Sequence, residues 1–429
     1  MIKKLKNNSF LLNTLITTAG IIFASVLNYL FQYFMAKYYS KEAYGGLQTL
    51  FSFIYLFSVP LNVIQNCVAF FVTRYIQEKK SNLIPMLFSR VTTIFIKIAG
   101  IFIILFTLSI PLLDKFLNLN SPVALFLLGV YLCTYLLIPI NRGILQGYFR
   151  FIPFAFSFII EAVLRLSFGL LLINLGLEGA MIATIISGAG IYALTYFPTR
   201  KLVRSELSKE KVTLSLKPFA KFITPVVLAY AFFTGMYTFD MIIVKHFFTG
   251  EEAGNYAILA LLGKIVFWTI SPVVNVLFPS SAKEKQNFKK SIHFLWLAMG
   301  ITASFGLPSV ALFFGVPQLL MHYLFPSYTF GAHLLGWAGS VMWLAGFSYV
   351  LINYHLSIEN TKIYRLPLAF FTLEVLALSF VHYSLEQVVY TLIALQAGLL
   401  LSLLWFTYSY MKKQKHGELQ SHDLITRTV

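Results

Sequence analysis

The sequence predicts an all-α, polytopic membrane protein of about twelve membrane-spanning helices arranged in two lobes. Hydrophobic residues make up 58% of the 429 positions and charged residues only 11%, whereas soluble domains carry roughly 25% charged residues. The apolar segments run for about 18 to 26 residues, the length that a helix needs to cross a bilayer. The basic residues are concentrated in alternate loops, as in multi-pass proteins.

Each apolar segment is predicted to be a helix because lipid offers no partner for an unpaired backbone group. Charged or proline-rich breaks separate the segments, which cover residues 10–34, 45–70, 87–110, 122–141, 152–174, 179–197, 219–244, 254–279, 291–315, 331–355, 367–383 and 387–411. The first segment follows three lysines, as a signal peptide would. It is too long for one and lacks a small-x-small cleavage pattern, so we expect an uncleaved first helix.

The distribution of the positive charge along the chain indicates the membrane topology. With the amino terminus in the cytosol, 26 of the 33 Lys and Arg residues fall in cytoplasmic tails and loops, and four fall in outer loops. This asymmetry follows the positive-inside rule and predicts that both termini are cytoplasmic. The net charge of +17 therefore does not call for nucleic acid as a partner, and anionic membrane lipids are the expected surface contact.

The longest cytoplasmic loop, residues 198–218, separates six predicted spans from six. We therefore expect an N-lobe of residues 1–205 and a C-lobe of residues 206–429 that ends in a short cytoplasmic tail. The segment SKEAYG at 40–45 has a counterpart in TGEEAG at 249–254, each between the first and second spans of a half. Two halves that start on the same side of the membrane are predicted to be parallel repeats.

Three basic residues, Lys97, Arg165 and Lys264, lie near the middle of apolar segments. Charges at that depth usually face a protein interior or a water-filled cavity and mark a binding site or pathway, so the three predict a site for an anion. Glu161 lies four residues before Arg165, a spacing at which the two side chains can meet. The pair is either a static brace or a switch that a substrate phosphate, or protonation of Glu161, opens.

Polar and small residues recur at helical spacing on the first, second and eighth spans, either to line a cavity or to pack helices together. Five of them are the predicted polar lining of a cavity: Asn28, Gln32, Asn62, Asn66 and Asn275. Glu161 and Glu374, within spans five and eleven, are candidates for ion coupling. The two cysteines, Cys67 and Cys133, have no metal-ligand spacing, and no phosphate-binding loop is present, so neither a cofactor nor a metal site is expected.

Several segments together resemble the oligosaccharide flippases, the polysaccharide-transporter branch of the multidrug/oligosaccharidyl-lipid/polysaccharide (MOP) exporter superfamily. They are NYLFQ at 28–32, YSKEAYG at 39–45, NRGILQG at 141–147, EAVLRL at 161–166, VKHF at 244–247, EEAGNY at 251–256 and GKI at 263–265. The resemblance covers nearly the whole chain. It rests on the order and topology of these segments, because no single motif is highly specific.

The resemblance implies a MATE-like, V-shaped bundle of two six-helix lobes that alternates between inward- and outward-facing states. It implies a transporter rather than an enzyme, which moves undecaprenyl-diphosphate-linked glycans to the outer leaflet of a prokaryotic cytoplasmic membrane. Glycan biosynthesis enzymes would work beside it, and coupling to H⁺ or Na⁺ stays open. Arg142, at the cytoplasmic end of span four, would either meet the arriving diphosphate or act as a positive-inside anchor.

Three other functions are weighed against this one. A cation-coupled multidrug antiporter of the same superfamily would be expected to carry an acid in its first-lobe cavity, and span one has none. A membrane-embedded glycan enzyme would be expected to carry a large outer loop or a His/Asp constellation. An inert scaffold would tolerate neutral substitutions of Lys97 and Lys264.

Overall fold

The computed structural model describes residues 9–206, 217–270, 273–274, 277–278, 281, 287–328 and 331–427. The regular secondary structure of these residues is helical. Within them, twelve helical segments are long and apolar enough to cross a membrane. The predicted all-α, multi-pass class and number of spans are therefore confirmed.

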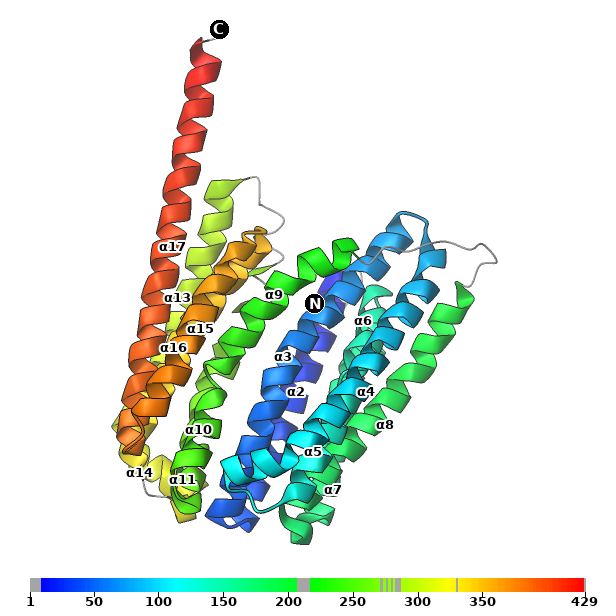
Figure 1. Cartoon of the computed structure of the whole chain (residues 1–429). Coiled ribbons are helices and arrows are strands. Elements are labelled where there is room, and N and C mark those ends of the chain that lie inside the picture. Colours follow the sequence, from blue (N-terminus) through cyan, green and yellow to red (C-terminus); the bar gives the residue numbers. More distant parts are fainter. Residues whose placement is uncertain are drawn as a thin grey trace. The chain divides into compact units, whose positions relative to one another are not determined.

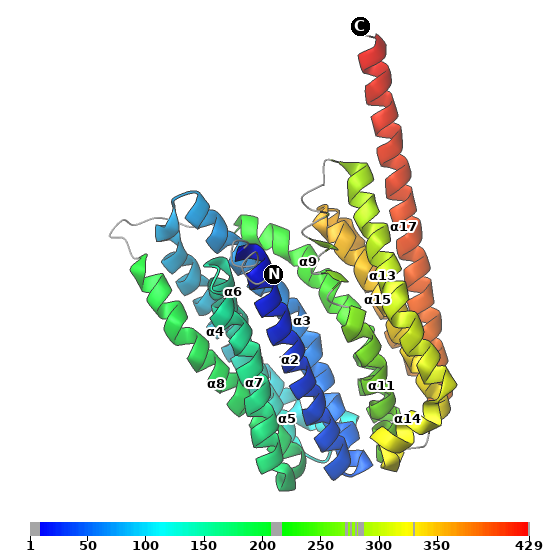
Figure 2. The same cartoon turned by 180° about the vertical axis from the view of Figure 1, so that it is seen from behind.

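The chain divides into two compact units. The first comprises residues 1–227 and 248–254, and the second comprises residues 228–247 and 255–429. The helices of the first unit are α2 (Ser9–Tyr38), α3 (Lys41–Gln77), α4 (Ile84–Leu117), α5 (Pro122–Tyr135), α6 (Ile138–Gly147), α7 (Phe151–Leu171) and α8 (Gly176–Ser205), with 3₁₀ turns η1 (Ser81–Leu83) and η2 (Ile173–Leu175). Helix α2 packs on α7, α7 on α8 and α3 on α6 (Figures 1 and 2).

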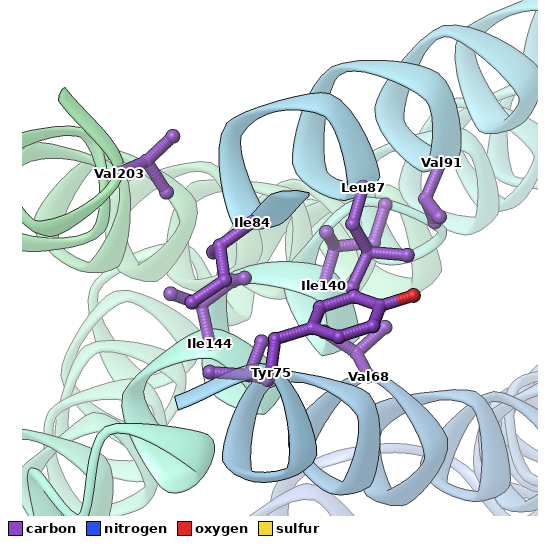
Figure 3. Packing of buried hydrophobic residues seen from close by; sticks show 9 residues of the cluster. Val68, Tyr75, Ile84, Leu87, Val91, Ile140, Ile144 and Val203 are labelled. Atoms are coloured by element: carbon purple, nitrogen blue, oxygen red, sulfur yellow. The ribbon is translucent and has the colours of Figure 1, made fainter. Parts of the chain in front are cut away.

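An apolar cluster joins four helices of the first unit. Tyr75 comes from α3, Leu87 from α4, Ile144 from α6 and Val203 from α8, and all are buried (Figure 3). Between membrane helices such side chains stabilise contacts by van der Waals packing. The cluster therefore holds α6 in place between α3, α4 and α8.

Two glycines on α6 allow it to approach α3 closely. A Cβ atom at Gly143 would lie 2.6 Å from the backbone oxygen of Gln65, and one at Gly147 would lie 2.6 Å from Cβ of Val72. Small residues spaced by four are a common means of close helix contact in membranes. The side chain of Gln146, next to Gly147, contacts Gln65 and Asn66 on α3, whereas that of Arg142, next to Gly143, contacts α7.

The helices of the second unit are α10 (Phe239–Phe247), α11 (Gly250–Ile270), α13 (Phe288–Gly315), α14 (Pro317–Leu324), α15 (Leu335–Ser357), α16 (Arg365–Phe380) and α17 (Leu385–Arg427). The 3₁₀ turns are η3 (Pro326–Tyr328), η4 (Ala332–Leu334) and η5 (Thr361–Tyr364). Helix α15 packs against α13 and α17, and α16 packs against α17 (Figures 1 and 2). Helix α9 (Lys217–Gly235) runs from the first unit into the second.

The two segments with similar sequence both begin a helix with a side-chain cap. The hydroxyl of Ser40 accepts a hydrogen bond from the backbone nitrogen of Ala43 at 3.2 Å. Thr249 accepts one from the backbone nitrogen of Glu252 at 3.3 Å, and its own backbone nitrogen donates to the Glu252 carboxylate at 3.0 Å. The second of these is a capping box, so the similarity reflects a shared local structure at the start of α3 and of α11.

Two spans are broken rather than continuous. Span four is divided between α5 and α6, where Pro139 occupies the first turn of α6. Span seven is divided between α9, which ends at Gly235, and α10, which begins at Phe239. Breaks free backbone groups from the helical ladder and are tolerated in membranes where protein or a cavity receives them. Each break lies next to one of the ionic clusters described below.

Candidate functional site

Three ionised side chains form a buried network in the first unit. A carboxylate oxygen of Glu161 on α7 accepts a hydrogen bond from Nη2 of Arg142 on α6 at 2.7 Å. The other oxygen accepts one from Nη2 of Arg165 at 2.8 Å. The predicted contact between Glu161 and Arg165 is confirmed, and the structure adds a second guanidinium. We call Arg142, Glu161 and Arg165 the arginine–glutamate triad; its net charge is positive.

Arg142 lies within helix α6, which continues to Gly147, beyond the predicted end of span four at residue 141. It is only 2% exposed, so its guanidinium contacts protein groups. The guanidinium lies 3.9 Å from the ring centre of Phe158, and Nε and Nη2 donate to the hydroxyl and carbonyl oxygens of Ser157 at 2.9 and 3.2 Å.

Arg165 is held from three sides. Besides its bond to Glu161, Nη1 donates to Oδ1 of Asn28 at 2.9 Å and Nη2 donates to the hydroxyl of Tyr131 at 3.3 Å. Its Nε atom is buried and has no hydrogen-bond partner among the described residues. Asn28 thus contacts a cation directly, which its place on a polar face of span one did not reveal.

A cavity of about 170 Å³ lies beside the triad. It is lined by Ile21, Ala24, Ser25, Asn28, Asn62, Tyr135, Arg142, Phe158 and Glu161. Among the described residues, hydrogen bonds engage Nε and Nη2 of Arg142 and none engages Nη1. A guanidinium with a spare N–H group at a mixed polar and aromatic wall suits an anionic oxygen.

The other predicted site residues of the first unit take different positions. Asn62 lines the cavity and Asn66 is exposed on the same helix. Gln32 is 3% exposed, and its Oε1 accepts a hydrogen bond from Gln48 at 2.6 Å, so it ties α2 to α3. Lys97 is exposed on α4 and is not among the residues that line the cavity. Asn275, predicted on span eight, lies outside the described residues.

A second buried cluster lies in the second unit and is acidic. Glu374 on α16 is completely buried, and neither of its carboxylate oxygens has a hydrogen-bond partner among the described residues. Asp240 on α10 lies within electrostatic range of Glu374. One oxygen of Asp240 accepts a hydrogen bond from the hydroxyl of Tyr256 at 2.5 Å, and the other is buried without a partner in the described part of the chain.

Two amide oxygens of this unit are buried and unpartnered as well. They are Oδ1 of Asn255 on α11 and Oε1 of Gln396 on α17. The amide nitrogen of Gln396 donates to the backbone oxygen of Met236, in the break between α9 and α10, at 3.3 Å. A cavity of about 10 Å³, lined in part by Asp240, Tyr256 and Leu392, lies in the same region. Unpartnered buried polar groups are rare in proteins and often indicate a missing water or ion.

Lys264 belongs to this second cluster. It is 5% exposed on α11 and lies within electrostatic range of Asp240. Its own span contains no acid at helical spacing, so this neighbour was not visible from the sequence. One ammonium and two carboxylates, when ionised, leave a net negative charge. We call Asp240, Tyr256, Lys264 and Glu374 the carboxylate cluster.

Asp240 was not among the predicted site residues; it lies near the outer end of predicted span seven and is 2% exposed. The signal that points to it is the helix break just before it, because broken helices often contribute to ion sites in transporters. The same signal applies to Arg142, which follows the break in span four. A proline does not accompany every such break: the break in span four has Pro139, but residues 236–238, where span seven breaks, include no proline.

No protein-family model and no curated protein sequence matches this chain at a significant level. Several solved structures, however, have a similar fold. The fold resembles that of an inward-facing multidrug resistance MATE family transporter of the MOP superfamily, with a TM-score of 0.72 and 13% identity over 90% of this chain and 95% of that one. It also resembles the lipid II flippase MurJ, with a TM-score of 0.67 and 16% identity over 92% and 87%.

A third similar structure is a MOP superfamily transporter from Pyrococcus furiosus, described as having reverse polarity of its binding pocket. The TM-score is 0.62, with 13% identity over 94% of this chain and 96% of that one. At these identities the likeness concerns the fold. The chain is thus a multi-pass membrane protein with the fold of MOP superfamily transporters.

Proposed function

We propose that the protein is a flippase that carries a lipid-diphosphate-linked oligosaccharide across the cytoplasmic membrane of a prokaryote by alternating access. The observation that carries this proposal is the cavity beside the arginine–glutamate triad, with Arg142 in its wall. Shared fold with a lipid II flippase supports it. Both termini would lie in the cytosol, where the glycan biosynthesis enzymes supply the substrate.

The chemistry of the cavity favours a diphosphate over a cationic drug. Two guanidiniums share one carboxylate, so the triad has a spare positive charge. Coulombic attraction is strong in a site of low dielectric, and the guanidinium fork matches phosphate oxygens. Glu161 does line the cavity, but both of its oxygens are engaged by arginines. A cationic drug would therefore meet a positive wall.

The triad also suggests how the site changes on binding. Glu161 occupies the place between two guanidiniums that a phosphate oxygen would prefer. An arriving diphosphate competes with the carboxylate for Arg142, while Arg165 is retained by Asn28 and Tyr131. Arg142 is then the contact residue and Arg165 the positioning residue. Lys97 and Lys264 stay proposed phosphate contacts, although a phosphate would have to compete for Lys264 with Asp240 of the carboxylate cluster. Substitution of each lysine by Ala is expected to lower transport.

The carboxylate cluster is the proposed coupling site. Its net negative charge and its unpartnered oxygens from Glu374, Asp240, Asn255 and Gln396 favour a proton or a small hard cation, for which oxygen atoms are the preferred ligands. A cavity of about 10 Å³ has room for one such particle. Glu374 is one of the two coupling residues that the sequence indicated, and Asp240 joins it here.

Transport by the purified protein in liposomes tests the substrate. We expect movement of a fluorescent undecaprenyl-diphosphate glycan and none of a cationic dye. Arg142→Gln should reduce the glycan rate by about tenfold or more, since a charged hydrogen bond is worth about 1.5–3 kcal/mol. Arg74→Gln is the matched control because Arg74 also bonds a glutamate, Glu78, at 2.7 Å but is exposed. Dye transport without glycan transport would contradict the proposal.

Gradients imposed across the same liposomes test the coupling. Wild-type transport should respond to either a proton or a sodium gradient, and Glu374→Gln should abolish the response. Glu386→Gln is the matched control, because Glu386 is exposed and pairs with His333 at 3.2 Å. An unchanged gradient response in Glu374→Gln would remove Glu374 from the coupling site.

A further inference from the structure

We infer that a row of amide side chains on α3 and α6 binds the first sugar of the substrate, one helical turn from Arg142. The inference rests on the proposed function and extends it to a second subsite. The row consists of Asn62, Gln65 and Asn66 on α3 and Gln146 on α6. We call these four residues the amide row.

The close packing of α6 on α3 brings the row together. Nε2 of Gln65 donates a hydrogen bond to Oε1 of Gln146 at 3.2 Å, and Nε2 of Gln146 reaches Oδ1 of Asn66 at 3.5 Å. Gly143, three residues before Gln146, and Gly147, directly after it, have no room for a Cβ against α3. The backbone contact sets the distance between the two helices, and the hydrogen bonds hold the amides of Gln65, Asn66 and Gln146 together.

The row continues the wall of the cavity. Asn62 and Arg142 both line it, and Asn66 and Gln146 each follow one of them by four residues. Four residues along a helix advance about 6 Å, so both helices offer an amide one turn beyond the cavity. A sugar attached to a diphosphate at Arg142 extends over this distance.

The hydrogen-bonding groups of the row suit a sugar better than a phosphate. An amide presents a donor and an acceptor, a phosphate oxygen only accepts, and a hydroxyl group does both. The amide of Asn62 has no hydrogen-bond partner among the described residues. Asn62 and Asn66 are both exposed. The row thus offers unused donors and acceptors side by side, which hydroxyl and acetamido groups match.

Gln65 acts through Gln146. It is 6% exposed, and its Oε1 is buried without a partner in the described part of the chain, although its Nε2 holds Gln146. An unsatisfied buried acceptor costs about 1–3 kcal/mol. If Gln65 served only to pack the helices, an apolar side chain in its place would stabilise the fold by removing this unsatisfied acceptor. We therefore assign Gln65 as a positioning residue for the sugar-binding amides.

Binding to the purified full-length protein tests the inference with two probes. One is a farnesyl diphosphate whose terminal phosphate carries a methyl group, and the other is the same diphosphate carrying N-acetylglucosamine. Wild type should bind the sugar probe about threefold to tenfold more tightly, as expected for one or two neutral hydrogen bonds. Gln146→Met and Asn66→Leu should remove this advantage and leave the affinity for the methyl probe unchanged.

Three further variants separate the roles. Gln77→Met, an exposed amide on the same helix, should change neither affinity. Gln65→Met should reduce the sugar advantage without affecting the methyl probe, an effect that a merely structural residue would not produce. Arg142→Gln should weaken both probes alike.

The outcomes distinguish the two proposals. Equal affinity of wild type for both probes, or a sugar advantage that survives in both Gln146→Met and Asn66→Leu, overturns the inference while the diphosphate site stands. Failure of wild type to bind either probe overturns the proposed function and the inference with it. Asn66 is exposed, so its variant keeps the test informative if a substitution at Gln65 or Gln146 prevents folding.

Discussion

The two ionic clusters, one in each unit, are built from similar side chains but satisfied in opposite ways. In the first unit, both oxygens of Glu161 receive a guanidinium N–H. In the second unit, neither oxygen of Glu374 has a partner among the described residues, and Asp240 has one unpartnered oxygen. The triad has a surplus of positive charge, and the carboxylate cluster has a surplus of negative charge when both of its carboxylates are ionised.

This difference indicates what each cluster lacks. The triad already satisfies its carboxylate, so a further ligand must be an anion that competes for the arginines. In the carboxylate cluster, one oxygen of Asp240 and both oxygens of Glu374 have no donor among the described residues, so we infer that its missing component is a proton or a cation. A buried charge that is already paired has a structural role besides any function, whereas an unpaired one is costly to keep. The comparison can be tested by making the same substitution in both clusters.

The largest expected effect is that of Glu161→Gln on stability. The variant leaves two buried guanidiniums without a counter-charge, and loss of one partner from a buried pair costs about 3–5 kcal/mol. The free energy of unfolding, measured by titration with sodium dodecyl sulfate, should fall by about that amount. A loss below about 1 kcal/mol would show that the triad is not a stabilising network.

The second prediction concerns the packing that positions Arg142. Gly143→Ala places a Cβ 2.6 Å from the backbone oxygen of Gln65, and overpacking of this kind costs about 1–3 kcal/mol. Gly100→Ala is the matched control, because a Cβ there meets nothing within 4 Å. The control should be neutral or slightly stabilising, since Ala favours a helix over Gly by about 0.5–1 kcal/mol. Equal stability of the two variants would contradict the close contact of α6 with α3.

The third prediction concerns the stability of Glu374→Gln and is opposite in direction to that for Glu161→Gln. Glu374→Gln removes a buried carboxylate that has no partner, so the variant should be as stable as wild type or about 1 kcal/mol more stable. The same detergent titration measures it beside Glu161→Gln. A loss of about 3 kcal/mol would mean that the ionised carboxylate of Glu374 is held by a partner, and the contrast between the units would disappear.

The smallest expected effect on stability is that of Lys97→Ala. Lys97 is exposed on α4, and substitutions at such positions usually change stability by less than about 0.5 kcal/mol. Glycan transport should fall, but less than in Arg142→Gln, because Lys97 is not among the residues that line the cavity beside the triad. Undiminished transport in both Lys97→Ala and Lys264→Ala would remove the two lysines from the proposed phosphate site.

The sequence by itself determined the class and the spans, because lipid accepts a backbone only when a helix or a closed barrel satisfies it. It also determined the contact of Glu161 with Arg165, since residues four apart on a helix lie on one face. The hydrophobic pattern alone could not show that Arg142 is buried in a helix, because apolar composition does not show how far a broken span continues.

Only the tertiary structure decided which helices contribute charged side chains to the same cluster. Arg142 reaches Glu161 because α6, which packs on α3 through its glycines, also packs on α7. Asp240 and Lys264 come from the consecutive helices α10 and α11, and Glu374 comes from α16, more than 100 residues further along the chain; nothing in their local patterns pairs them. Packing between spans, where small residues and buried charges decide the fit, assembled both sites.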